Sequence, residues 1–243
     1  MLQEAQSLPE LGQLLVDPVF RGVDIPRGDG RQVVVIPGLF GGDAYLEPLR
    51  SWLRRIGYLP VRSTLAFNAG CPRRLREQVQ AEIMRHLEVM RAPVALIGHS
   101  RGGVIAWSIA AQMRDRVSHL AVLGAPIGAY RRAVESGTDL SPHTPLGRVL
   151  GQASGWARRL LDPACNAPAC GCAFVADLMR PLSPATALLA IMSRDDHVVP
   201  RESSQIAEGT TVEVSGSHAG LVYNRQVYRE LADFLTRPRN ARV

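Results

Sequence analysis

The feature of this 243-residue sequence that most restricts its fold is a set of short, uninterrupted apolar runs. They stand at 33–36, 94–97, 120–123 and 187–192. A short apolar run bounded by turn residues indicates a strand buried on both faces, because a strand with one wet face alternates apolar and polar residues. Strands of this kind are typical of parallel sheets that are covered by helices on both sides.

Segments with helical spacing alternate with these runs. The spacing of apolar residues predicts amphipathic or buried helices at 45–56, 73–90, 102–114 and 222–236. Two weaker strands are expected at 58–63 and 212–214, and a mild helical pattern precedes residue 30. The alternation predicts an α/β fold, with a mostly parallel central sheet and helices on both faces.

One long segment interrupts the alternation. About 60 residues separate the runs at 120–123 and 187–192, and they hold Gly, Pro, three Cys and only weak helical signals. In a parallel α/β architecture such a segment is an insertion on the rim of the sheet. Residues 1–243 are therefore predicted to form a single domain with a lid-like insertion at about 128–185, a size that one core can support.

The basic residues are all arginine. The chain has 28 arginines, no lysine and a formal net charge of +6, which excludes Schiff-base chemistry and the lysine of a phosphate-binding loop. The arginines are spread as short pairs, and aromatic residues make up 5% of the chain. Neither a basic run nor a set of stacking aromatics is present, so nucleic acid is not expected as a partner.

The sequence shows no membrane or export signal. No apolar run approaches the roughly 18 residues that a membrane-spanning helix needs, so stable membrane insertion is not expected. The first ten residues lack the basic end and apolar run of a signal peptide. A cytoplasmic location is the expectation, and secretion after removal of an upstream leader stays open.

The strongest chemical signal is GHSRGG at 98–103. It matches the G-x-S-x-G pattern, and it follows a predicted buried strand and opens a predicted buried helix. A serine on such a sharp turn needs glycine neighbours, because a Cβ two residues away would collide with the turn. The helix N-terminus also offers N–H groups to a developing negative charge. The pattern predicts that Ser100 is a nucleophile.

A serine nucleophile needs a base, and His218 is the candidate. It lies in SGSHAG at 215–220, a loop of small residues between the last predicted strand and the last helix. Enzymes with this elbow have the order serine, acid, histidine along the chain. His99 within the elbow is expected to point away from the serine, and His197 is interpreted as a neighbour of the acid.

The acid that orients the base should follow the strand at 187–192. There the chain reads SRDDHVVP, which places two carboxylates, Asp195 and Asp196, side by side. Neighbouring residues that leave a strand point to opposite sides, so only one of the two can face His218. Residue patterns by themselves leave both candidates open.

The chain resembles the α/β-hydrolase superfamily, and within it the compact lipases and esterases of high-GC bacteria. The resemblance covers nearly the whole chain, from Val33 to Leu235. It rests on four motifs: VVVIPGLFGG, GHSRGG, SRDDHVVP and SGSHAGLVYN. In such enzymes the acid is the Asp three positions after the serine of S-x-x-D-x-x-V, and in this chain that residue is Asp196.

The resemblance also implies two donors to an oxyanion. The segment IPGLFGG looks like the oxyanion loop of the family, with Pro37 where a histidine is usual. By that match the donors are the backbone N–H groups of Leu39 and Arg101. The missing histidine removes a side chain that often braces the loop, so Phe40 stays open as an alternative to Leu39.

The implied activity is that of a serine carboxylic-ester hydrolase that acts through an acyl-enzyme and needs no cofactor or metal. The implied partner is a small-molecule ester with a hydrophobic acyl group, bound under the 128–185 insertion. Two alternatives remain, a thioesterase or acyltransferase that acts on carrier-bound acyl chains, and a non-catalytic binding protein of this fold. The sequence does not indicate an oligomeric state.

Four cysteines leave three interpretations open. Cys165, Cys170 and Cys172 cluster in the insertion, and Cys71 stands apart. They can form disulfides, a four-thiolate metal site, or small buried contacts. The C-x₄-C-x-C spacing fits zinc sites poorly, and no metal site is predicted.

Overall fold

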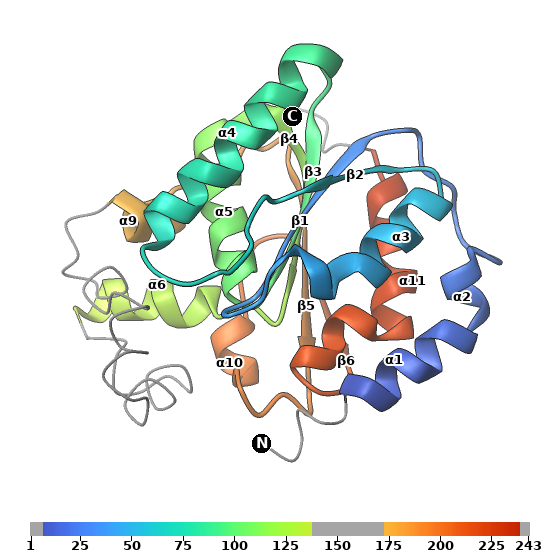
Figure 1. The fold of residues 1–243 in the computed structure, drawn as a ribbon. Coiled ribbons are helices and arrows are strands. Elements are labelled where there is room, and N and C mark those ends of the chain that lie inside the picture. Colours follow the sequence, from blue (N-terminus) through green and yellow to red (C-terminus); the bar gives the residue numbers. More distant parts are fainter. Residues whose placement is uncertain (1–6, 138–172, 239–243) are drawn as a thin grey trace.

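The computed structural model describes residues 7–137 and 173–238, and its centre is a six-stranded sheet (Figure 1). The strand order is β2-β1-β3-β4-β5-β6, and every neighbouring pair is parallel. The predicted central sheet is thus confirmed. The strands are β1 (Gln32–Ile36), β2 (Leu59–Arg62), β3 (Val94–His99), β4 (Val117–Leu123), β5 (Ala187–Ser193) and β6 (Thr210–Val214).

The burial of the strands follows their sequence pattern. All residues of β1, β3, β4 and β5 are buried, because these strands lie inside the sheet and are mostly apolar on both faces. The edge strands β2 and β6 are partly exposed. Pro60 lies in β2, at the edge of the sheet. It is tolerated there because an edge strand has only one neighbouring strand, so the N–H that proline lacks is not needed for a second one.

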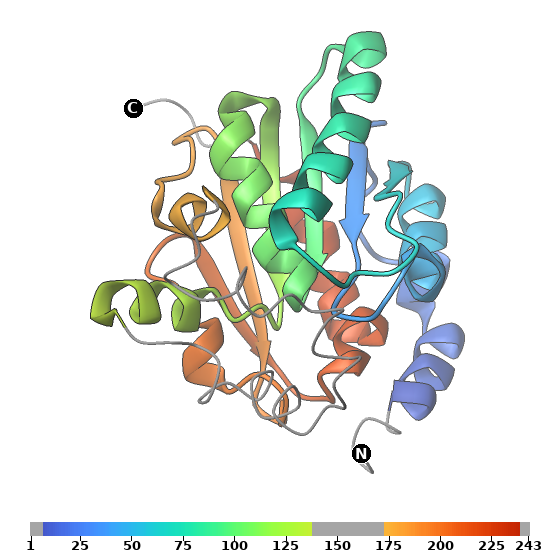
Figure 2. The same ribbon diagram turned by 60° about the vertical axis from the view of Figure 1, so that its left-hand side comes forward.

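Helices cover both faces of the sheet (Figures 1 and 2). In β1, Val34 and Ile36 face one apolar cluster and Val33 and Val35 the other, as expected from side chains that alternate along a strand. None of the helices in the described part of the chain is long and apolar enough to cross a membrane. The first cluster is completed by α4 (Pro72–Met90), α5 (Arg101–Met113), α6 (Ile127–Ser136) and α9 (Ala173–Met179), and the second by α1 (Ser7–Val16), α2 (Pro18–Arg21), α3 (Glu47–Arg55) and α11 (Arg225–Thr236).

The described ends of the predicted insertion are packed on the body of the molecule. Helices α6 and α9 contribute buried residues to the first cluster. On α9 the buried carboxylate of Asp177 accepts hydrogen bonds from Arg76 of α4, at 2.8 Å, and from Ser108 of α5, at 2.7 Å. These bonds fasten the returning end of the insertion to two core helices. Residues 138–172 lie outside the described residues.

Two predicted helices are interrupted in the structure. The segment expected as one helix at 222–236 is a 3₁₀ turn, η5 (Ala219–Tyr223), followed by α11. Asn224 separates them because its side chain caps α11, accepting from the N–H groups of Gln226 and Val227. The segment at 45–56 likewise begins with a 3₁₀ turn, η2 (Asp43–Leu46), before α3. The remaining short elements are η3 (Arg114–Arg116) and α10 (Arg201–Ser204).

Candidate active site

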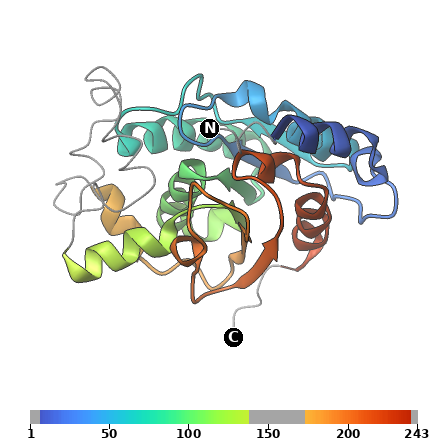
Figure 3. The ribbon, with the colours of Figure 1, turned by 90° about the horizontal axis from the view of Figure 1, so that it is seen from below.

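Three polar residues follow three strands at one edge of the sheet. Ser100 comes directly after β3, Asp196 follows β5, and His218 follows β6. The carboxyl ends of parallel strands meet at the same edge, which Figure 3 views from below. The topology therefore brings together residues that lie up to 118 positions apart in the chain.

Ser100 occupies a strained turn between β3 and α5. Its φ is 53° and its ψ is −125°, a conformation that L-residues rarely adopt and that costs roughly 1–3 kcal/mol. The Ser100 N–H donates to the carbonyl of Leu123 at the end of β4, at 2.7 Å, and this bond holds the turn in place. The turn presents the serine side chain at the edge of the sheet.

The glycines of the elbow are required by close approach of the backbone. A Cβ on Gly102 would stand 2.3 Å from the carbonyl oxygen of Ile36, and one on Gly98 would stand 2.5 Å from the carbonyl oxygen of Gly102. Both distances are far below van der Waals contact, and the obstructing atoms are backbone. The G-x-S-x-G pattern thus has the steric basis expected from the sequence.

His218 lies within hydrogen-bond distance of the serine. Its Nε2 is 2.9 Å from Ser100 Oγ, and the histidine side chain is 8% exposed. Its Nδ1 is 2.6 Å from Asp196 Oδ2. The ring therefore bridges a carboxylate and a hydroxyl, the arrangement in which an imidazole can take a proton from the hydroxyl.

Asp196, and not Asp195, reaches the histidine. The other oxygen of Asp196 accepts from the N–H groups of Val198, at 2.8 Å, and Val199, at 2.7 Å, so the carboxylate is fixed from both sides. Asp195 points elsewhere and accepts from the N–H of Gly216 at 3.0 Å. The two neighbouring carboxylates lie in the turn that follows β5 and bond to different partners.

The loop after β1 lies against the serine. A Cβ built on Gly38 would stand 3.3 Å from Ser100 Cβ, so the backbone of Gly38 passes close to the serine side chain. The N–H of Phe40 donates to the carbonyl of Asn68 at 3.0 Å. Within residues 7–137 and 173–238 the N–H of Leu39 has no acceptor.

Arg101 combines two features. Its backbone opens α5 directly after the serine, where a helix presents its N–H groups. Its side chain is buried and donates to the carbonyl groups of Asn68, at 3.3 Å, and Gly70, at 2.5 Å. The guanidinium thereby ties the 68–70 loop to the elbow, a contact that the sequence did not reveal.

Two aromatic rings stand exposed beside this loop. Phe40 and Phe67 stack with their ring centroids 5.6 Å apart. Their exposed fractions are 40% and 48%, high values for phenylalanine side chains. An apolar surface is thus present one residue from Leu39.

Sequence reasoning missed Glu10 of α1. Its two carboxylate oxygens accept from the N–H of Ser217, at 2.8 Å, and from the hydroxyl of Ser217, at 2.6 Å. Ser217 directly precedes His218, so α1 holds the loop that carries the histidine. No local pattern could have signalled this contact, because the two residues stand 207 positions apart.

His99 also lies nearer the site than the sequence suggested. Its Nδ1 is 2.9 Å from the hydroxyl of Tyr45, and its Nε2 is 2.9 Å from the carbonyl oxygen of His218. Burial, joined by repulsion from His218, lowers the pKa of His99 to about 3. The ring is therefore neutral near pH 7.

The depressed pKa of His99 predicts a loss of stability in acid. In the unfolded chain this histidine titrates near its ordinary pKa of 6.5, so below pH 6.5 the unfolded chain binds a proton that the folded chain rejects. The stability that His99 contributes is complete above pH 6.5 and is lost as the pH falls toward 3. From this group we expect the free energy of unfolding to fall by roughly 1 kcal/mol per pH unit in that window.

Urea unfolding at a series of pH values measures this slope. The control is His99→Gln, whose side chain does not titrate, and its free energy of unfolding should depend less steeply on pH between 6.5 and 3. Equal slopes in the two proteins would mean that His99 takes up its proton over the same pH range in the folded and the unfolded chain, so that its pKa is not lowered by folding.

Of the four cysteines, one lies within the described residues. Cys71 is half-buried directly before α4, and Cys165, Cys170 and Cys172 lie outside the described residues, so the cysteine interpretations stay predictions. In the described part of the chain, no group of three or more His, Cys, Asp or Glu side chains is placed to hold a metal ion.

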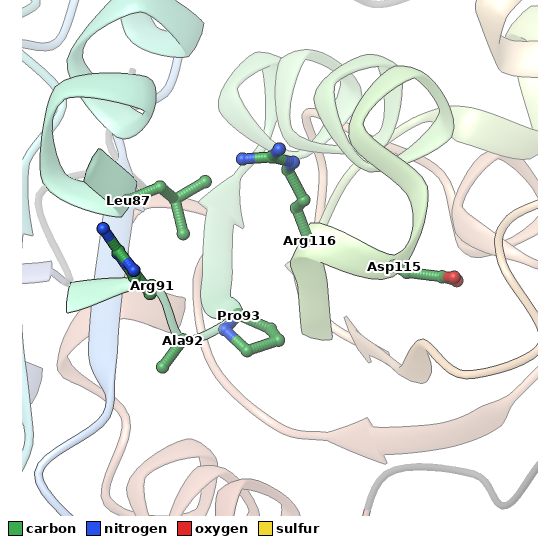
Figure 4. Close-up of a pocket in the computed structure, with 6 residues that line it drawn as sticks. All are labelled: Leu87, Arg91, Ala92, Pro93, Asp115 and Arg116. Atoms are coloured by element: carbon green, nitrogen blue, oxygen red, sulfur yellow. The ribbon is translucent and has the colours of Figure 1, made fainter. Parts of the chain in front are cut away.

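A pocket of about 360 Å³ opens at the opposite edge of the sheet. Figure 4 shows its lining, which comes from the segments that precede β3 and β4 and is made of Leu87, Arg91, Ala92, Pro93, Asp115 and Arg116. It lies at the amino ends of strands whose carboxyl ends carry the site, and it does not adjoin the serine.

Comparison with known proteins gives likeness in structure only. No family model and no curated protein matches the sequence. The structure is similar to the mature lipase BlEst2 of Bacillus licheniformis, with a TM-score of 0.61 and 14% identity over 88% of this chain and 96% of that one.

Two further solved structures give the same picture. A monoacylglycerol lipase from Paleococcus ferrophilus has a TM-score of 0.53 and 13% identity over 87% of this chain and 96% of that one. A thermophilic esterase from Thermogutta terrifontis has a TM-score of 0.51 and 16% identity over 86% of this chain and 90% of that one. At such identities the likeness establishes the fold and nothing finer.

Proposed function

The chain has the α/β-hydrolase fold that these lipases and esterases share, and from that premise we propose that it is a serine hydrolase of carboxylic esters. The observation that carries the proposal is the unbroken hydrogen-bonded series from Asp196 through His218 to Ser100. A carboxylate that orients a histidine, which in turn contacts a serine hydroxyl, is the arrangement that activates serine for acyl transfer.

The reaction proceeds in two steps. His218 Nε2 takes the proton of Ser100 Oγ as that oxygen attacks the ester carbonyl carbon, and Asp196 keeps the other ring proton on Nδ1. The oxygen of the tetrahedral intermediate carries the negative charge. When the intermediate collapses, the protonated His218 gives its proton to the departing alcohol, and the acyl group stays on Ser100. Water, deprotonated by the same histidine, then releases the acid.

The charge on the tetrahedral oxygen is met by two N–H groups, those of Leu39 and Arg101. Leu39 is favoured over Phe40 because the Phe40 N–H already donates to Asn68. Arg101 contributes from the N-terminus of α5, where the helix dipole also favours negative charge. Each donor of this kind is worth about 10²–10³ in rate.

The substrate proposed is an ester with a hydrophobic acyl group. The exposed pair of Phe40 and Phe67 supports it, because Phe40 adjoins Leu39 and an apolar chain near the oxyanion site can cover these rings. We further propose that the 128–185 insertion forms the roof of the acyl pocket within a single domain. Its fastening through Asp177 to α4 and α5 supports a fixed position for its returning end.

The test is stopped-flow release of p-nitrophenol from a series of esters, from acetate to palmitate. We expect a burst equal to the enzyme concentration, followed by steady turnover that rises with acyl length. The acyl group should be found on Ser100 by mass spectrometry of protein quenched in acid. A burst without turnover would indicate a transferase that awaits another acceptor.

The same measurement with acyl thioesters separates the nearest alternative. A much higher kcat/KM for a thioester than for the oxygen ester of the same acyl chain would replace the proposal with a thioesterase. Neither burst nor turnover on any ester or thioester would overturn it in favour of a binding protein of this fold.

A further inference from the structure

A series of hydrogen bonds, buried between His99 and His218 and partly buried at Tyr45, joins the loop after β1 to the histidine loop. The N–H of Gly38 donates to the hydroxyl oxygen of Tyr45 at 2.8 Å. That hydroxyl is 2.9 Å from His99 Nδ1, and His99 Nε2 is 2.9 Å from the carbonyl oxygen of His218. The two ends of this series are the N–H of Gly38, which precedes the proposed oxyanion donor Leu39, and the carbonyl of His218, the proposed base.

Only one distribution of protons satisfies all three bonds. A carbonyl oxygen can only accept, so His99 Nε2 must carry a hydrogen and donate it to His218. His99 is neutral, because burial lowers its pKa to about 3, and Nδ1 therefore carries no hydrogen and accepts. The single hydroxyl hydrogen of Tyr45 points to Nδ1, which leaves the tyrosine oxygen as the acceptor for Gly38.

The residues that form this series of hydrogen bonds are tightly packed. A Cβ on Gly38 would stand 2.9 Å from His99 Nδ1, and one on Gly41 would stand 2.4 Å from a ring carbon of Tyr45. The carbonyl of Tyr45 accepts from the hydroxyl of Tyr223 at 2.9 Å, and burial raises the pKa of Tyr45 so that its hydroxyl keeps its proton. A shift at one end must therefore be felt at the other.

We propose that Tyr45 and His99 are positioning residues, which hold the oxyanion loop and the base in register with Ser100 through the bonds to Gly38 and His218. The inference rests on the ester hydrolysis proposed above. Gly38 directly precedes Leu39, so its N–H bond sets the path of the peptide that carries the oxyanion donor. The bond to the His218 carbonyl sets the backbone from which the imidazole reaches Ser100. Neither residue touches the substrate or exchanges protons with it.

The first test is Tyr45→Phe, which removes one oxygen and leaves Gly38 N–H and His99 Nδ1 unpaired. We expect kcat for p-nitrophenyl butyrate to fall about 10- to 100-fold with KM nearly unchanged, because misplacement of reacting groups acts on the transition state. The matched control is Tyr228→Phe. It also removes a buried tyrosine hydroxyl, one that donates to Val222 at 3.1 Å, and it should keep the wild-type kcat.

The second test is a pair of substitutions at His99. In Gln the amide oxygen can accept from Tyr45 and the amide nitrogen can donate to the His218 carbonyl, whereas Leu can do neither. His99→Gln should retain most of kcat, and His99→Leu should lose it about as strongly as Tyr45→Phe. If near-ultraviolet circular dichroism shows that Tyr45→Phe does not fold, this pair of His99 variants tests the positioning role without it.

The outcomes separate this inference from the function on which it rests. Equal kcat for Tyr45→Phe and Tyr228→Phe, or equal losses for His99→Gln and His99→Leu, would overturn the positioning role while ester hydrolysis stands. The rate at which a fluorophosphonate labels Ser100 gives a readout without ester turnover, and it should fall in Tyr45→Phe and His99→Leu alone. A wild-type protein that neither turns over esters nor takes the label would overturn both proposals.

Discussion

Replacing Ser100 with alanine is expected to lower kcat for p-nitrophenyl esters by about 10⁵–10⁶-fold and to abolish the burst. Without Oγ there is no nucleophile for the acyl group, and no other hydroxyl is held by His218 within the described residues. The residual rate should come from water activated by the histidine and from the oxyanion donors, which act whether or not a serine is present.

The control is Ser51→Ala on α3, which removes a serine hydroxyl from a helix that does not carry the site. It should keep the wild-type rate and the stoichiometric burst. The Ser100→Ala protein should retain the fold. The backbone at this position is strained, with a φ of 53°, and alanine meets the same strain as serine. A folded Ser100→Ala protein with more than a trace of the wild-type turnover would contradict the acyl-enzyme mechanism.

The substitution Asp196→Asn is expected to lower kcat by about 10⁴-fold while leaving the fold intact. An asparagine amide can donate to His218 Nδ1, and the ring hydrogen then lies on Nε2. In this tautomer Nε2 cannot take the proton of Ser100. The Oδ1 position still accepts from the N–H groups of Val198 and Val199, so the local backbone should not change.

Asp195→Asn is the matched control, because it makes the same chemical change at the neighbouring position. Asp195 is exposed and its bond to the Gly216 N–H can be kept by the amide oxygen. Its kcat should remain close to that of the wild type. The reverse pattern, with the large loss in Asp195→Asn, would mean that the wrong carboxylate has been placed in the mechanism.

The sequence predicted those parts of the fold that depend on local chemistry. The apolar runs indicated the positions of β1, β3, β4 and β5 because a strand that is buried on both faces is mostly apolar. The boundary between η5 and α11 was not predicted. Apolar spacing continues across Asn224, and only the bonds of its side chain to Gln226 and Val227 show that the helix starts there.

The candidate site was predictable in part for the same reason. Ser100 stands in a pattern whose glycines are required by local sterics, and His218 was predicted from the order serine, acid, histidine along the chain. The choice between Asp195 and Asp196 came from resemblance, because two adjacent carboxylates in a loop look alike to any local rule. The bonds that distinguish them are long-range, because Asp195 accepts from Gly216, 21 positions away, and Asp196 meets His218, 22 positions away.

The individual buried strands, the strained serine turn and the position of the histidine loop could therefore be predicted from the sequence, since each signal lies in residues close together in the chain. The tertiary structure alone decided which carboxylate meets His218, that Glu10 holds the histidine loop, and that Tyr45 and His99 join Gly38 to His218. The difference lies in the sequence separation over which each interaction acts. Backbone sterics and apolar periodicity act over a few residues, whereas a hydrogen bond between positions 99 and 218 exists only after the strands have set their order.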